Sequence, residues 1–162
     1  MLALRYLYVL ALVVWLGGMV VLGAIVAPTT FQVLQASEPA SGRELAGILF
    51  GTMIARFHYV AYGCGLVLLL SSGAIAILGP RPRHFLIRTL VIFAMLAVAL
   101  YSGYVVLGRI DAIQAEAGML PSRLAATDLR RIEFDWLHLL STWLMMFNIV
   151  AALVLLYWEA RE

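Results

Sequence analysis

Four long apolar stretches, separated by more polar segments, dominate the chain. They cover residues 2–27, 57–78, 85–107 and 134–158. At about 1.5 Å per residue, each is long enough as an α-helix to cross an apolar layer of about 30 Å. Residues 28–56 and 108–133 are expected to lie largely outside this layer. The pattern predicts an all-α fold, an integral membrane four-helix bundle with antiparallel up-down spans, in one domain covering residues 1–162.

Prolines, glycines and polar residues predict where the first two helices end. Pro28 is expected to end the first helix or to kink it near the membrane surface. The polar run at residues 36–45 predicts a loop. Residues 46–55 then form either an interfacial helix or an early part of the second span. Residues 79–83, Gly-Pro-Arg-Pro-Arg, predict a short turn.

The segment between the third and fourth spans carries its own end signals. Its first part is expected to prolong the third helix as far as Gly118. Thr127 or Asp128 is expected to cap the helix that leads into the fourth span, because short polar side chains accept hydrogen bonds from the first free backbone amides.

The composition supports the membrane interpretation. Hydrophobic residues make up 64% of the chain and charged residues 12%, with a mean hydropathy of +1.00. A soluble domain carries about twice that share of charge. The net charge of +2 gives no indication of nucleic-acid binding, and the lipid bilayer is the expected partner. The first apolar run is longer than the core of a signal peptide, so we expect it to be retained as a transmembrane helix.

Arginine placement predicts the orientation. Arg81, Arg83 and Arg88 lie close together around the tight turn between the second and third spans, with no acid among them. Positive residues favour the cytoplasmic side. Both termini and this turn are therefore expected in the cytoplasm, with the protein in a bacterial inner membrane.

A polar stripe marks one face of the fourth span. His138, Ser141, Met145 and Asn148 recur at helical spacing in a helix that is otherwise mostly apolar. Such a stripe is expected to face the neighbouring helices rather than lipid. The single cysteine, Cys64, lies within the second span, excludes an intrachain disulfide and is expected to be a packing residue.

The second span carries a matching histidine. His58 lies near its start, with Tyr62 one turn further on. In an antiparallel bundle the starts of the second and fourth spans lie on the same membrane side, so His58 and His138 are expected at similar depth. Neutral imidazoles on facing helices are ligands for haem b or a transition metal. The pair predicts a haem b site, with copper as the alternative, for electron transfer or for haem or metal handling.

Other residues near the same end are candidates for a haem pocket. Tyr62 and Trp136 are expected to line it, and Arg56 and Arg109 to pair with propionates. Ser141 and Asn148 join the candidate set through the polar stripe. Five glycines are expected to make room for a flat macrocycle: Gly17, Gly18, Gly63, Gly65 and Gly103.

Simpler interpretations remain beside this one. Histidines, tyrosines and tryptophans near helix ends often form an interfacial belt, and Met145 with Met146 is typical of soft packing. The protein is then a cofactor-free structural or assembly subunit of a larger membrane complex. A metal or drug tolerance transporter is a third possibility, which would require a homo-oligomer to build a pathway. No nucleotide-binding, nucleophile-elbow or HExxH motif is present, and no acid lies deep within a span.

Three segments resemble a known family. WLGGMVVLGAIVAPTTFQVL at 15–34, AGILFG at 46–51 and FDWLHLLSTWLMMFN at 134–148 are similar to the transmembrane-protein-205-like family of unknown-function domains. The resemblance implies a four-span helical membrane protein. The positions that carry it are Trp15, Gly17, Gly18, Pro28, Phe31, Phe50, His138, Ser141 and Asn148.

Distant relatives extend what the resemblance implies. The copper-resistance D-type proteins and the HemJ-type protoporphyrinogen oxidases imply copper or haem handling through histidines in the membrane. Those relatives tend to carry a histidine in the first span, where this sequence has Arg5, Tyr6 and Tyr8. The difference argues against a HemJ-like oxidase activity.

Overall fold

In a computed structural model, which describes residues 2–79, 84–118 and 121–161, the chain folds into four long helical rods. The first rod is α1 (Leu2–Val21), continued by the π-helix η1 (Leu22–Val26) and by α2 (Ala27–Ser37). The second rod is α3 (Gly42–Leu78). The third is α4 (Phe85–Leu100), continued by the π-helix η2 (Tyr101–Val106) and by α5 (Leu107–Ala117), and the fourth is α6 (Leu129–Glu159). A short 3₁₀ turn, η3 (Pro121–Arg123), precedes α6. No strand occurs in these ranges.

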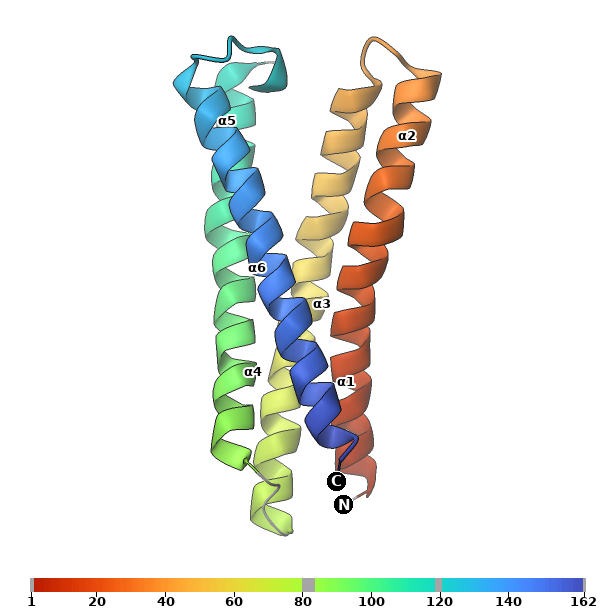
Figure 1. Ribbon diagram of the computed structural model, residues 1–162, viewed down its shortest axis with the longest axis vertical. Coiled ribbons are helices and arrows are strands. Elements are labelled where there is room, and N and C mark those ends of the chain that lie inside the picture. The colour runs from red at the N-terminus through yellow and green to blue at the C-terminus, as the bar shows by residue number, and fades with distance from the viewer. Residues whose placement is uncertain (1, 80–83, 119–120, 162) are drawn as a thin grey trace.

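The rods form an antiparallel up-down bundle, as predicted. The α1 rod packs against α3, α3 against α4, α4 against α6, and α6 against α1. Helices α3 and α6 therefore stand diagonally. Both chain ends lie at the same end of the bundle, together with the connection from α3 to α4 (Figure 1). The connections before α3 and before α6 lie at the other end.

The surface of the bundle is suited to lipid. Each of the four rods is long and apolar enough to cross a membrane. Large apolar side chains point outward along their middles, including Leu70, Phe93 and Trp143, which are 64%, 64% and 67% exposed. Because water would penalise so much exposed apolar surface, the chain is an integral membrane protein.

The first rod is longer than the sequence predicts. Pro28 does not end the helix, which continues to Ser37. The π-helix η1 lies just before Pro28, and the wider turn accommodates a proline ring that would otherwise clash with the carbonyl four residues earlier. The expectation that Pro28 ends the helix was wrong, because the wider π-turn accommodates the missing backbone hydrogen bond.

The connecting segments are correspondingly shorter. The predicted loop at 36–45 reduces to Glu38–Ser41, and residues 46–55 belong to α3. Of the predicted turn at 79–83, only Gly79 lies within the described residues. Gly118 ends α5 in the left-handed conformation, with φ 61°, as predicted. Asp128, and not Thr127, caps α6: its carboxylate accepts from the backbone N–H of Arg130 at 2.9 Å.

The buried core lies mainly in the half of the bundle that holds the termini. Its largest members are Trp15, Leu12, Leu68, Ile92, Met95 and Leu155. Gly65 permits close packing there, because a Cβ at this position would lie 2.8 Å from Leu96 Cδ1 and 3.3 Å from Trp15 Cζ3. Cys64 is buried in the same core, so its predicted role as a packing residue is confirmed.

Ion pairs join three rods at the terminal end. Arg88 of α4, only 4% exposed, donates to Glu159 of α6 at 3.0 Å. Arg5 of α1 donates to the other oxygen of the same carboxylate at 2.9 Å. Glu159 therefore connects α1, α4 and α6 at the point where the chain begins and ends.

Replacing the shared carboxylate is expected to destabilise the bundle. Glu159→Gln removes the counter-charge of a buried arginine, so we expect the free energy of unfolding to fall by about 3 kcal/mol. Arg5→Gln is the matched control: the Arg5 side chain is 40% exposed, and we expect a loss of at most about 1 kcal/mol. Thermal unfolding in one detergent compares the two variants, and equal losses would contradict the importance of the buried pair.

The α6 cap is expected to weaken in acid. The hydrogen bonds from the Arg130 side chain and backbone hold the pKa of Asp128 below its usual range. A lowered folded-state pKa means that the cap's stabilisation is present above the ordinary aspartate pKa and is lost as pH falls through the lowered value. The protection of the Arg130 amide against hydrogen exchange, measured relative to the intrinsic exchange rate at the same pH, should fall over that interval. In Asp128→Ala, exchange should already be fast at neutral pH, and an unchanged rate would show that the cap is unimportant.

Candidate functional site

A cavity of about 320 Å³ lies between the diagonal helices α3 and α6, with η1 and the start of η2 contributing to its walls. This volume is near the lower limit of ordinary small-molecule sites, about 300 Å³. Most of the lining is apolar. The uncharged polar side chains in it are Ser102, Ser141, Thr142 and Asn148, and the titratable side chains are His58 and His138. No described Arg, Asp or Glu lines it, so the cavity favours an uncharged molecule or an ion of low charge.

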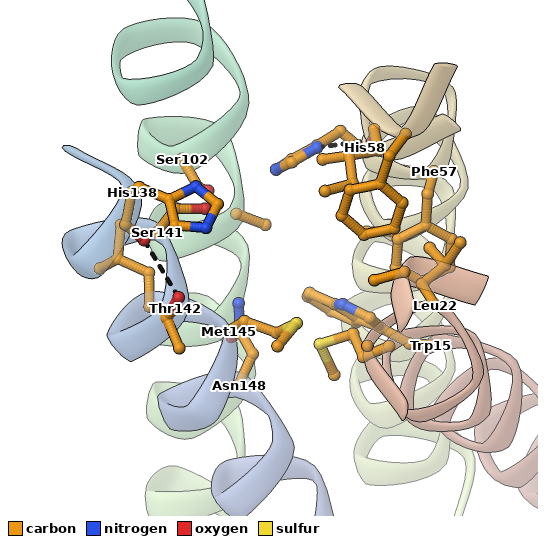
Figure 2. Close-up of a pocket in the computed structure, with 18 residues that line it drawn as sticks. Trp15, Leu22, Phe57, His58, Ser102, His138, Ser141, Thr142, Met145 and Asn148 are labelled. Carbon is orange, nitrogen blue, oxygen red and sulfur yellow. Dashed lines mark hydrogen bonds between the residues drawn. The ribbon is translucent and has the colours of Figure 1, made fainter. Parts of the chain in front are cut away.

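The hydrogen bond of His58 fixes its tautomer. Its Nδ1 lies 2.9 Å from the carbonyl oxygen of Ile54, one turn earlier in α3. A carbonyl can only accept, so Nδ1 carries a proton, and in the neutral ring Nε2 keeps its lone pair. Figure 2 shows the ring extending from α3 toward α6. Metal-bound histidines commonly have this arrangement, with one nitrogen donating to a carbonyl and the other free for a ligand.

His138 reaches the same cavity from the opposite wall (Figure 2). Its ring stacks on Phe134, with centroids 6.3 Å apart and planes at 13°. Thr142 donates to the His138 carbonyl at 3.0 Å, an ordinary bond between a helical threonine and the preceding turn. The structure therefore brings together the two histidines that the sequence paired by depth.

Asn148 lies at the other end of the cavity, below Met145 in Figure 2. It is 5% exposed, and its Oδ1 has no hydrogen-bond partner among the described residues. A buried amide oxygen left unpaired costs about 1–3 kcal/mol. Ser141 and Met145 line the cavity between Asn148 and His138, so all four members of the predicted stripe face inward.

Three predicted pocket residues lie elsewhere. Tyr62 stacks on Tyr104, with centroids 5.7 Å apart, and donates to the Ala99 carbonyl at 3.4 Å. Trp136 is 58% exposed, and Arg56 is also exposed. None of the three lines the cavity. Arg56 and Trp136 point outward, whereas Tyr62 shares a face with His58 but turns its ring toward Tyr104.

The residues expected to frame a haem also lie outside the cavity. Arg109, the second expected propionate partner, pairs with Glu133 at 2.7 Å instead. A Cβ at Gly17 or Gly63 would meet no atom within 4 Å, whereas Cβ atoms at Gly18, Gly65 and Gly103 would meet tightly packed side chains. None of these five glycines lines the cavity.

Several lining residues were not predicted. Trp15, Met19 and Leu22 recur at helical spacing in the first rod and resemble ordinary core positions. Ser102 is a single polar residue in an apolar span. The thioethers of Met19 and Met145 both line the cavity. Among the described residues no group of three or more His, Cys, Asp or Glu side chains gathers, so a metal here would need these softer ligands or the histidine pair alone.

The comparisons with known proteins identify a family. Residues 10–119 match the family model described as a domain of unknown function, DUF4149, and the chain belongs to that family. Comparisons with curated proteins and with solved structures gave no match. The resemblance drawn from the sequence is thus confirmed as far as an uncharacterised family. The histidine motif of the fourth span lies beyond the matched residues.

The absence of a side chain at Gly103 is expected to leave the space that the His58 ring occupies. A Cβ at Gly103 would lie 2.8 Å from His58 Cδ2 and would also clash with the Tyr62 hydroxyl. We expect Gly103→Ala to displace the His58 ring and to lower stability by about 1–3 kcal/mol.

Gly63→Ala is the matched control, because its Cβ would enter open space. That variant should be neutral or slightly more stable, since alanine favours a helix. Side-chain NMR of His58 and thermal unfolding compare the two variants. An undisturbed His58 in Gly103→Ala would show that this glycine does not position it.

Proposed function

We propose that the protein binds a transition metal within the membrane through His58 and His138, for electron transfer or metal handling. The observation that carries the proposal is the meeting of two imidazoles from diagonal helices at one cavity, with Nε2 of His58 left available. Interior histidines in membrane spans are costly to bury and are often functional.

The lining favours copper over haem b. Haem carries two anionic propionates, yet no described arginine lines the cavity and the expected partners lie outside it. The macrocycle also needs a flat cradle, and the five candidate glycines do not provide one. The residues present therefore do not fit haem b well.

Copper(I) suits the same residues. It carries a single charge and prefers soft thioether and imidazole ligands. His58, His138, Met19 and Met145 line the cavity without a carboxylate, which disfavours divalent ions that need charge compensation. Bound copper would supply one-electron redox chemistry. The protein's own groups would orient the ligands: the Ile54 carbonyl fixes the His58 tautomer, and the Phe134 ring supports His138.

The sequence supports further parts of the proposal. The resemblance to the transmembrane-protein-205-like family and its copper-resistance D-type relatives agrees with metal handling. We place the protein in a bacterial inner membrane with both termini cytoplasmic, from the arginines that flank the α3–α4 connection. Association with other membrane subunits or with a second copy is compatible with the outward apolar faces.

Metal analysis tests the proposal. Protein purified in detergent, loaded with copper(I) under reducing conditions and then desalted should retain about one copper per chain. His58→Ala and His138→Ala should each lose most of it. His84→Ala is the matched control, because His84 is exposed near the terminal end.

The same preparation separates the alternatives. A Soret band in protein expressed with ample haem, lost in both cavity histidine variants, would overturn copper and restore the haem b interpretation. If the protein retains neither metal nor haem, the cofactor-free structural subunit is the interpretation that stands. In that case the histidines serve as polar contacts between helices.

A further inference from the structure

We infer that the end of the cavity around Asn148 is a second binding site, for a neutral, lipid-soluble ring that carries a carbonyl group, of the quinone class. The site does not depend on the proposed metal centre, because Asn148 and Trp15, which carry the inference, are not among the proposed metal ligands.

The amide of Asn148 presents a hydrogen-bond donor to the cavity. The side chain is 5% exposed and lines the cavity, and Figure 2 shows its nitrogen directed into that space. Among the described residues this side chain has no hydrogen-bond partner: the oxygen is enclosed, and the N–H group is left to face the cavity. In a membrane interior such a donor needs an acceptor. The carbonyl oxygen of a ligand is an acceptor that brings no net charge.

The indole of Trp15 faces Asn148 across the cavity. Trp15 lines the cavity from α1, is 1% exposed, and lies at a similar level to Asn148 in Figure 2. Its benzene ring packs against α3 where Gly65 has no side chain, since a Cβ there would lie 3.3 Å from Trp15 Cζ3. The face of an indole is electron-rich. A quinone ring is electron-poor, so stacking of the two rings is electrostatically favourable.

Small side chains leave room for a ring at this end. Ala61 of α3 and Ala99 of α4 both line the cavity, and in their rods they lie on the terminal side of His58 and Ser102. The whole cavity, about 320 Å³, is near the lower limit of small-molecule sites, which suits a single substituted ring. Carboxylates and phosphates are disfavoured because no described arginine lines the cavity.

The two polar levels are far enough apart to act separately. Asn148 follows His138 by ten residues in α6, which is about 15 Å along a helix. A metal ion at the histidines therefore leaves the end at Asn148 unoccupied. The surrounding bilayer is a direct source of a lipid-soluble quinone.

Binding of duroquinone tests the inference, with hexamethylbenzene as a probe of nearly the same shape that lacks the carbonyl groups. In isotope-labelled protein in nanodiscs, duroquinone should move a side-chain amide signal of Asn148 saturably, and hexamethylbenzene should not. The indole N–H signal of Trp15 reports the binding of both probes in every variant. At equal concentration in the lipid, duroquinone should bind about tenfold more tightly, the value of one well-placed hydrogen bond.

Two variants show whether the Asn148 amide makes this hydrogen bond. Asn148→Leu should abolish the preference for duroquinone, and the matched control Ser72→Ala, buried outside the cavity, should retain it. A preference that survives in Asn148→Leu would overturn the inference. Equal affinities for the two probes in the unmodified protein, or an Asn148 amide signal that duroquinone does not move, would also overturn it, and these two readouts do not require the variant to fold.

Metal-depleted protein and His58→Ala separate this site from the proposed copper site. Both should keep the preference for duroquinone, which would support the quinone site even if copper binding failed. Loss of the preference in both would show that the ring binds at the histidines, and would overturn a separate site at Asn148.

Discussion

The cost of leaving a charge unpaired in an apolar layer is the constraint that organises this bundle. Charged side chains lie toward the ends of the rods, and several of them form ion pairs there. Arg88 is the most buried of them, and it lies against Glu159, which also binds Arg5. At the other end Arg109 pairs with Glu133. Between the two ends, the polar side chains of the described residues that line the cavity are histidines and uncharged groups.

The cavity follows from how the rods pack between these ends. The four rods lie together at the end that holds the termini, and α2 and the start of α3 diverge from α5 and α6 at the other end (Figure 1). Helices α3 and α6 are diagonal and are separated by the cavity. Two π-helices, η1 and η2, each contribute to the walls. A wider helical turn changes the direction of the side chains that follow it, so these irregularities help to shape an interior space. Glycine at position 103 then allows α4 to approach the His58 ring.

The sequence predicted the fold more completely than the site. Apolar length and antiparallel order determine the four rods, and Gly118 and Asp128 gave correct ends because local geometry decides them. The predicted helix end at Pro28 was wrong because a π-turn, which no sequence pattern indicates, accommodates the proline within a continuous helix. The inward stripe of His138, Ser141 and Asn148 followed from periodicity. Arg56 and Trp136 were proposed from depth alone, and both side chains are exposed, because the face of the helix also decides what a side chain meets. Tyr62 lies beside His58, as the periodicity indicated, but its ring stacks on Tyr104 and does not line the cavity.

The buried amide of Asn148 is a polar group that the packing of the bundle does not require. A leucine would fill the same position without an unsatisfied oxygen, and the core beside it is already apolar, with Trp15 and Leu155. Packing alone therefore gives no reason for an asparagine. The amide nitrogen of Asn148 points toward the cavity in Figure 2, so it is through this N–H donor that the side chain faces the interior space. At the opposite level of the cavity, His58 also combines a bond within its own helix with a group directed toward the interior. Its Nδ1 donates to the Ile54 carbonyl, and the rest of the ring is directed toward the cavity.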